Sequence, residues 1–177
     1  MITKEQYDKA VKRALEYFDW AGITLTDAEK ARVEVADFGL SDLDNIGLEI
    51  MTYVNTDRVC AKELILFPYQ TCPEHRHVDG AARAGKEETF RCRRGKVYLY
   101  VAGKAAENIA ARPINSKTTV YHEIVLNPGE QYTLKPNTKH WFQGGPEGAV
   151  VSEFSTSSSD ETDIFTDKNV KRIPVVK

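Results

Sequence analysis

The first stretch of the chain has the periodicity of an amphipathic helix. Apolar residues recur every three to four positions, with lysines and glutamates between them: Tyr7, Ala10, Val11, Ala14, Leu15 and Phe18. Thr3 and Gln6 have the spacing of a capping box, and Gly22 is a typical residue to end the helix. Thr26 and Glu29 repeat the start signal, which predicts a second helix of about two turns, up to about Val33.

From residue 46 onward the pattern changes to short runs rich in Val, Ile, Tyr, Phe and Thr, which is typical of β-strands. The expected strands are 46–54, 58–67, 87–93, 96–101, 118–126, 131–134, 140–143 and 149–155. Turn signals separate them, among them 55–57, 94–95, 127–129 and 144–146. Strands and turns that alternate without helices favour an antiparallel barrel or sandwich. In the tail, Ile164 and Phe165 are expected to pack back on this body.

Length and composition are those of one globular domain. The 177 residues are 41% hydrophobic and 28% charged, with a net charge of −2. This balance offers no basic surplus to a nucleic acid, and no apolar run approaches the ~20 residues that cross a bilayer. The N-terminus lacks the layout of a signal peptide, and three cysteines without a CxxC pair fit reduced thiols. We expect one cytoplasmic domain, with a helical segment at 1–35, a barrel at 36–167 and a tail at 168–177.

Three of the four histidines fall where they could bind a metal together with a carboxylate. His75 and His77 form an H-x-H pair, and residues two apart on an extended chain face the same side. Glu88 and His140 each begin an expected strand. An H-x-H pair alone is more often two solvated histidines, but the addition of Glu88 and His140 favours a metal site. The fourth histidine, His122, lies outside this pattern and is expected to be packed or exposed.

These residues resemble the two motifs of the cupin superfamily. Glu88 and Gly95 match the second half of the first motif, and Gly129 and His140 have the spacing of the glycine and histidine of the second. The resemblance implies an all-β fold, in which a small antiparallel barrel or jelly roll carries the N-terminal helices on its outside.

The chain departs from the cupin motifs at several positions. A loop at 78–87 replaces a tight turn, Tyr69 stands at the first motif glycine, and Asn137, which tolerates a left-handed turn, replaces another. The departures leave all four presumed metal ligands in place: His75, His77, Glu88 and His140. Three imidazoles and a carboxylate suit an octahedral Mn, Fe, Co or Ni ion that keeps two positions open.

A narrower resemblance covers residues 23–167. The segments 54–58, 62–68, 72–77, 88–93, 136–143 and 150–153 together are similar to those of the small bacterial D-lyxose isomerases. For this family the resemblance implies a homodimer with Mn²⁺ as cofactor, for which Co²⁺, Ni²⁺ or Fe²⁺ could substitute. It also implies a monosaccharide substrate, through conversion of D-lyxose to D-xylulose and usually of D-mannose to D-fructose, by proton transfer through a metal-stabilised enediolate.

Such an isomerase needs a base that reaches a carbon-bound proton. Glu153 is the first candidate, because strand alternation puts it on the same face as Ala149 and Val151, which we interpret as the barrel interior. The alternative is a buried glutamate that a neighbouring cation satisfies. Lys86 lies two residues before Glu88, where it could move a proton to oxygen or bind hydroxyls, or be a solvated loop lysine.

Four further residues are candidates for substrate contact. Lys62 and Glu74 could bind sugar hydroxyls, and Lys62 is expected to share the inward face of its strand. Phe90 and Phe142 could form an apolar wall of the pocket, although core packing is the simplest role for each.

Two other functions use the same ligands. An Fe(II) cupin dioxygenase would bind O₂ at one open position of the metal. It would need no carbon-acid base, so an inward Glu153 with a lysine nearby argues against it. A non-catalytic sugar-binding cupin would bind its ligand without exchanging the C2 proton with solvent.

Overall fold

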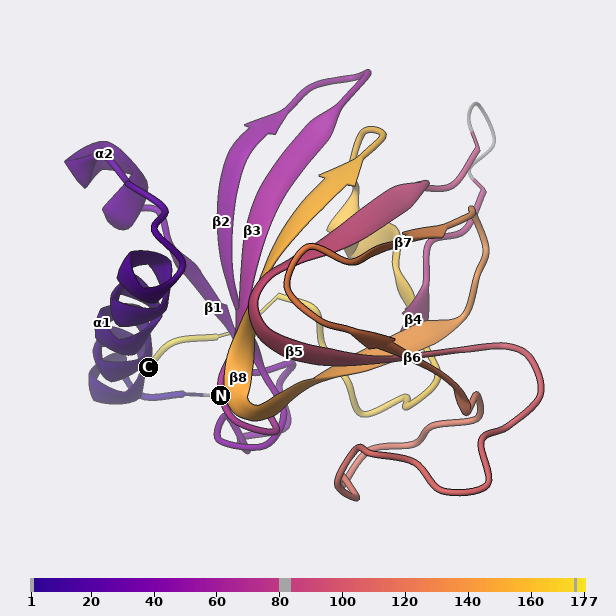
Figure 1. Ribbon diagram of the computed structural model, residues 1–177. Helices are drawn as coiled ribbons and strands as arrows, with labels where there is room; N and C mark the ends of the chain where they lie inside the picture. The colour runs from indigo at the N-terminus through magenta and orange to yellow at the C-terminus, as the bar shows by residue number, and fades with distance from the viewer. Residues whose placement is uncertain (1, 80–83, 174) are drawn as a thin grey trace.

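The computed structural model describes residues 2–79, 84–173 and 175–177, so part of the 78–87 loop lies outside the described residues. Two helices come first, α1 (Lys4–Trp20) and α2 (Asp27–Lys30) (Figure 1). Strands then follow: β1 (Glu34–Ala36), β2 (Leu48–Asn55), β3 (Cys60–Leu66), β4 (Thr71–Arg76), β5 (Glu88–Val101), β6 (His122–Leu126), β7 (Gln131–Leu134), β8 (His140–Ser155) and, after the 3₁₀ turn η1 (Asp160–Thr162), β9 (Ile164–Phe165).

The helices begin where the sequence predicts. Thr3 caps α1 and Thr26 caps α2, each in a complete capping box. Helix α2 makes a single turn and ends at Lys30, short of the expected Val33. None of the helices in the described residues has the length and apolar character needed to cross a membrane.

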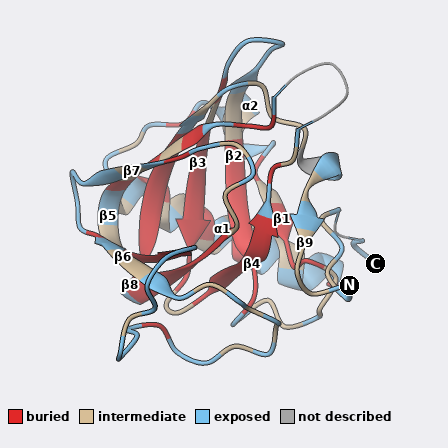
Figure 2. Ribbon diagram, turned by 90° about the vertical axis from the view of Figure 1, so that its right-hand side faces the viewer, coloured by how far each residue is buried: buried red, intermediate tan, exposed pale blue. Residues whose placement is uncertain are grey.

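The strands form one antiparallel sheet that curls into a barrel. Its order is β1-β2-β3-β8-β4-β9, and β5 pairs with β6, β7 and β8. Buried residues concentrate on the strands of the barrel, and exposed ones on the loops (Figure 2). Helix α1 lies outside, where Ala14 and Phe18 pack against Met51 and Ile65 on the outer sheet face. The fold therefore confirms the predicted all-β barrel with external N-terminal helices.

Strands β5 and β8 are long, and their ladder folds back on itself. Val101 pairs with His140 at one end, and Glu88 pairs with Ser155 at the other. On a straight ladder the two ends would be roughly 40 Å apart, at about 3.3 Å a residue. In the barrel, Glu88 Oε1 and His140 Nε2 are 3.1 Å apart. The curl of a single ladder thus brings two candidate metal ligands together.

Two glycines permit this bend. Gly95 in β5 has φ +73° and Gly148 in β8 has φ +80°. A Cβ on Gly95 would lie 2.1 Å from the Gly148 carbonyl oxygen, and one on Gly148 would lie 2.4 Å from that of Leu66. The expected strand breaks at 94–95 and 144–146 were wrong. Strands β5 and β8 continue through these positions, because β-bulges and glycines accommodate the turn residues within the strands.

The strands missing from the sequence prediction are short or irregular. Strand β4 contains Pro73, which normally argues against a strand, but a register shift between Cys72 and His75 accommodates it.

Strand β6 starts at His122 rather than 118, because the Thr119 amide binds a side chain from β4 instead of a neighbouring strand.

The tail returns to the body, as Ile164 and Phe165 predict. Both residues form β9, which pairs with β4, and Phe165 packs on the barrel core. The last residues then run beside the N-terminus, where Ile2 and Val176 form a parallel bridge and the Lys177 amide donates to the Ile2 carbonyl at 3.0 Å. In Figure 1 both ends lie next to α1.

One carboxylic acid is buried between the sheet and the helical layer. Glu49 of β2 is fully buried, and Gln70 Nε2 donates to its Oε1 at 3.3 Å. Its Oε2 has no hydrogen-bond partner among the described residues. Burial raises the pKa of Glu49 from 4.5 to about 8, against the opposing effects of Gln70 and Arg13.

We expect Gly95→Ala to lower the free energy of unfolding by at least about 3 kcal/mol, because the new Cβ meets the backbone of β8. Gly129→Ala is the matched control, since Gly129 also has a positive φ (+92°) but nothing within 4 Å of its Cβ position. Its free energy of unfolding should fall by only about 1 kcal/mol. Urea unfolding measures both variants, and equal losses would show that the close approach does not constrain the bend.

Glu49 should make the protein less stable as pH rises. Between about pH 4.5 and pH 8 the unfolded carboxyl has released its proton while the folded one keeps it. The unfolded state then binds fewer protons, so the free energy of unfolding falls across this window, by on the order of 4 kcal/mol. Urea unfolding at pH 5 and pH 8 should show that Glu49→Gln loses less stability than the parent. An identical pH dependence would contradict this assignment.

Candidate active site

The two histidines of the H-x-H pair lie at the end of β4. His75 is in the strand, His77 follows it, and the exposed Arg76 between them points the other way. Both histidines are buried, and their ring centroids are 4.9 Å apart. The extended chain therefore presents both imidazoles to the barrel interior, as the spacing predicts.

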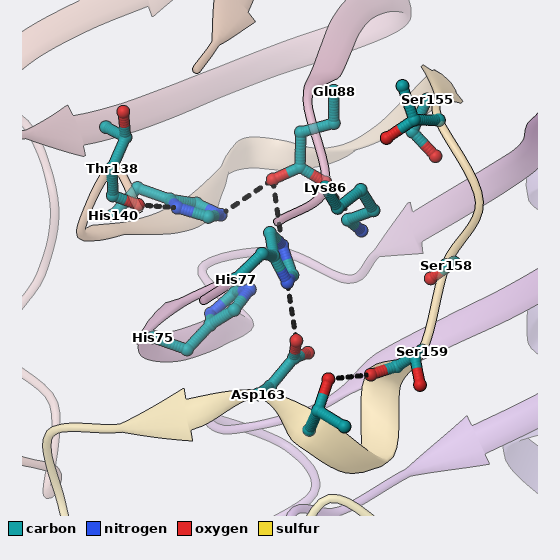
Figure 3. Close-up of polar contacts among 12 residues, drawn as sticks. His75, His77, Lys86, Glu88, Thr138, His140, Ser155, Ser158, Ser159 and Asp163 are labelled. Atoms are coloured by element: carbon teal, nitrogen blue, oxygen red, sulfur yellow. Dashed lines mark hydrogen bonds and ion pairs between the residues drawn. The ribbon is translucent and has the colours of Figure 1, made fainter. Parts of the chain in front are cut away.

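His140 and Glu88 complete the cluster from the first residues of β8 and β5 (Figure 3). Nitrogens of His75, His77 and His140 lie within 4.8 Å of one another, so they could bind one ion. Glu88 Oε1 is 3.0 Å from His77 Nε2 and 3.1 Å from His140 Nε2. All four predicted ligands are thus brought together inside the barrel.

The hydrogen bonds behind the rings orient the imidazoles for a metal. His75 Nδ1 donates to the Pro73 carbonyl at 2.8 Å, and His140 Nδ1 donates to the Thr138 carbonyl at 2.9 Å. Since a carbonyl only accepts, each ring keeps its proton on Nδ1 and presents the Nε2 lone pair inward. His140 Nε2 has no hydrogen-bond partner among the described residues. A divalent cation would satisfy these inward lone pairs, so the donor set fits a metal.

Asp163 holds the third imidazole. Its Oδ1 accepts from His77 Nδ1 at 2.5 Å, so that a carboxylate lies behind a presumed metal ligand (Figure 3). This arrangement fixes the orientation of the ring and makes its other nitrogen, Nε2, a stronger electron-pair donor to a metal. The sequence prediction missed Asp163 because it comes from the tail, where only the adjacent Ile164 and Phe165 indicated packing on the barrel.

The charged groups of the cluster strongly influence one another. Burial, together with His140 and His77, holds the pKa of His75 well below 6.5. Burial acts in the same direction on His77, but Glu88 and Asp163 outweigh it and raise its pKa to about 9. Burial alone would raise the pKa of Glu88, yet Lys86, His77 and His140 hold it well below 4.5. The carboxylates therefore favour positive charge at this point of the barrel.

Glu153 lies inside the barrel, as strand alternation predicts. It is buried in β8, and Lys86 Nζ lies 3.0 Å from its Oε1. The same Nζ lies 2.7 Å from Glu88 Oε2. Lys86 is itself buried, so the alternative of a solvated loop lysine was wrong. One lysine thus links the carboxylate of the metal cluster to a second carboxylate.

A cavity of about 30 Å³ adjoins these groups. Lys62, Phe90 and Phe142, which are candidates for substrate contact, line the cavity, and so does Arg172 from the tail, which the sequence pattern did not indicate. Further walls are apolar, namely Phe38, Leu48, Ile50, Leu64 and Phe165.

Glu74 does not reach this cavity. Its carboxylate accepts from the amides of Thr119 and Val120 and from the Thr119 and Thr166 hydroxyls. Burial raises the pKa of Glu74, but these hydrogen bonds outweigh it and lower the pKa below 4.5. The residue anchors the segment before β6, and the structure places it away from the predicted substrate contacts.

The other metal-binding residue types lie apart from the cluster or are unsuited to it. His122 is exposed, and its Nδ1 donates to the Lys104 carbonyl at 3.0 Å, as expected for a histidine outside the site. All three cysteines are buried and free of disulfides. Cys72 lines the cavity, but burial raises the pKa of its thiol well above 9, which disfavours the thiolate that a metal needs.

Comparison with known proteins places this geometry in context. The family model of D-lyxose isomerase matches residues 26–177. The D-lyxose/D-mannose isomerase of Thermosediminibacter oceani is 57% identical over 180 residues, covering 100% of this chain and 99% of the relative. The D-lyxose ketol-isomerase of Cohnella laeviribosi is 60% identical over 175 residues, covering 97% and 96%. The L-ribose isomerase of Acinetobacter sp. DL28, solved with L-ribose, shares the fold with a TM-score of 0.77 at 16% identity, covering 99% and 98% of the two chains.

We expect His140→Ala to lose most of the bound divalent metal, because one inward nitrogen donor disappears. His122→Ala is the matched control, since it removes an exposed imidazole outside the cluster. Metal content after loading with Mn²⁺ and desalting, measured by mass spectrometry, compares the two with the parent. A full metal complement in His140→Ala would remove this residue from the ligand set.

Proposed function

The chain belongs to the D-lyxose isomerase family and is an aldose–ketose isomerase, and we propose that it interconverts D-lyxose with D-xylulose and D-mannose with D-fructose. The names of the close relatives support these substrates. The observation that carries the proposal is the buried Glu153, paired through Lys86 with Glu88 beside the histidine cluster. Proton abstraction from carbon requires a base, and this second carboxylate can supply it.

The proposed cofactor is Mn²⁺, held by the histidine cluster and Glu88. When bound, a divalent ion there supplies Lewis-acid polarisation of the neighbouring oxygens on C1 and C2 of the sugar. Co²⁺, Ni²⁺ and Fe²⁺ are substitutes, because three imidazoles and a carboxylate accept each of them.

Glu153 is the proposed catalytic base. In the aldose-to-ketose direction, its carboxylate takes the proton from C2, which leaves an enediolate, and then returns that proton to C1. Burial within the barrel limits the access of bulk water to this step, so that transfer of the proton between the two carbons competes with its exchange with solvent. Ser155 Oγ, which donates to Glu153 Oε1 at 3.4 Å, helps to hold the carboxylate in place.

Lys86 is proposed to serve the oxygen atoms. While the proton moves between carbons, O1 must gain a proton and O2 must lose one. Nζ of Lys86 lies between the two carboxylates, where it can donate to O1 and recover the proton from O2. Lys62, Phe90 and Phe142 are proposed to contact the sugar from the cavity walls.

The competing functions have less support. A dioxygenase has no use for an inward Glu153, and the relatives are named as isomerases rather than as binding proteins. A homodimer in the cytoplasm stays a prediction from the family resemblance.

The parent enzyme, loaded with Mn²⁺ under argon, should convert D-lyxose and D-mannose to ketoses. In D₂O, deuterium should enter C1 or C2 of the product. Glu153→Gln should lower kcat by about 10²–10⁴-fold, because it removes the base, while the metal content stays that of the parent. Ketose formation, deuterium incorporation by NMR and metal analysis measure these three quantities.

Glu63→Gln is the control for this experiment. Glu63 is a buried glutamate of the neighbouring strand β3, but it binds Ser152 Oγ at 2.9 Å and does not line the cavity. Its substitution should leave kcat within about twofold. Full activity of Glu153→Gln would exclude it as the base, and a parent that isomerises neither sugar would refute the proposed substrates.

A further inference from the structure

The inner cavity, at about 30 Å³, is far smaller than the pocket of about 480 Å³ that adjoins it. If C1 and C2 lie beside the histidine cluster and Glu153, the remaining carbons can extend into this adjoining space.

A larger pocket of about 480 Å³ meets the cavity at Lys62 and Arg172, since both side chains line both spaces. Most of the residues that line the outer pocket are polar, and they include Thr52, Asn55, Ser158, Ser159 and Glu161. Hydroxyl, amide and carboxylate groups of this kind bind sugar hydroxyls, which both donate and accept hydrogen bonds.

Arg172 is held firmly at this boundary although it belongs to the tail. Its Nη1 lies 2.5 Å from Glu34 Oε1 of β1, and the side chain is only 14% exposed. The preceding Lys171 amide donates to the Phe38 carbonyl at 2.8 Å. Beyond Arg172, the bridge of Val176 with Ile2 secures the chain again. The backbone is therefore anchored on both sides of Arg172, and the guanidinium itself is held by Glu34.

The charges at the boundary suit an uncharged ligand. Glu34 and Glu161 lie in the outer pocket together with Lys62 and Arg172, so two carboxylates balance two cations. A guanidinium carries five N–H donors in a fixed plane, so one contact with Glu34 can set its orientation while it also binds a hydroxyl.

We propose that Arg172 is a substrate-binding residue that donates hydrogen bonds to a hydroxyl on C4 or C5, the carbons remote from C1 and C2, with the outer pocket as their subsite. This inference rests on the proposed function, because it takes the reacting end of an aldose to lie at the histidine cluster. Arg172 then sets the affinity for the sugar, and Glu153 performs the chemistry.

Arg172→Ala should raise KM for D-lyxose at least about tenfold and leave kcat within about threefold, because the contact is equal in the bound and reacting states. Metal content should match that of the parent. Arg172→Lys keeps the charge and loses the planar fork, so its KM should lie between those of the parent and Arg172→Ala. Lys171→Ala is the matched control, since it truncates the exposed neighbouring side chain, and it should behave as the parent.

The 4-deoxy and 5-deoxy analogues of D-lyxose test the contact itself, as alternative substrates or competitive inhibitors. Arg172→Ala should weaken D-lyxose binding but leave binding of at least one analogue unchanged, because that analogue lacks the hydroxyl that Arg172 contacts. Equal weakening of all three sugars would show a purely structural role, and no weakening of D-lyxose would also overturn the proposal. A parent enzyme that does not isomerise D-lyxose would instead refute the proposed function.

Discussion

The closure of the β5–β8 ladder is the constraint on which the site depends. Glu88 and His140 begin the two strands and lie at opposite ends of their ladder, yet their side chains meet inside the barrel. Only a sheet that bends sharply can do this, and the bend needs the close backbone approach at Gly95 and Gly148. The backbone conformation at these two glycines and the placement of two candidate metal ligands are therefore linked through the register of one strand pair.

The balance of buried charge gives the site its chemical character. Glu88, Glu153 and Asp163 place three carboxylates around the cluster, whereas Lys86 supplies one ammonium group between two of them. Unpaired charge is costly inside a protein, so this group of residues favours an additional cation. The raised pKa of His77 reflects the same local field. A divalent ion would answer this demand, and Lys86, which contacts both Glu88 and Glu153, would keep the proposed base close to it.

Local patterns in the sequence were enough for much of this description. The H-x-H spacing placed His75 and His77 on one side, and strand alternation placed Glu153 inside the barrel, because both depend only on neighbouring residues. Asp163 and Arg172 could not be found in this way, since the tail reaches the site through long-range packing. Glu74 was misplaced for a related reason: the irregular register of β4 around Pro73 and the segment at 119–120 together decide where its carboxylate points.

The meeting of the tail with Ile2 makes the described chain nearly a closed ring. The Lys4 amide donates to the Lys177 carbonyl at 2.9 Å, so a short linker could join the two ends without moving either. New termini could then be opened at the exposed turn at 127–130, between β6 and β7, as circular permutation generally requires. In such a permuted enzyme the segment that carries Arg172 would no longer be next to a chain end. It would become an internal connection between β9 and α1.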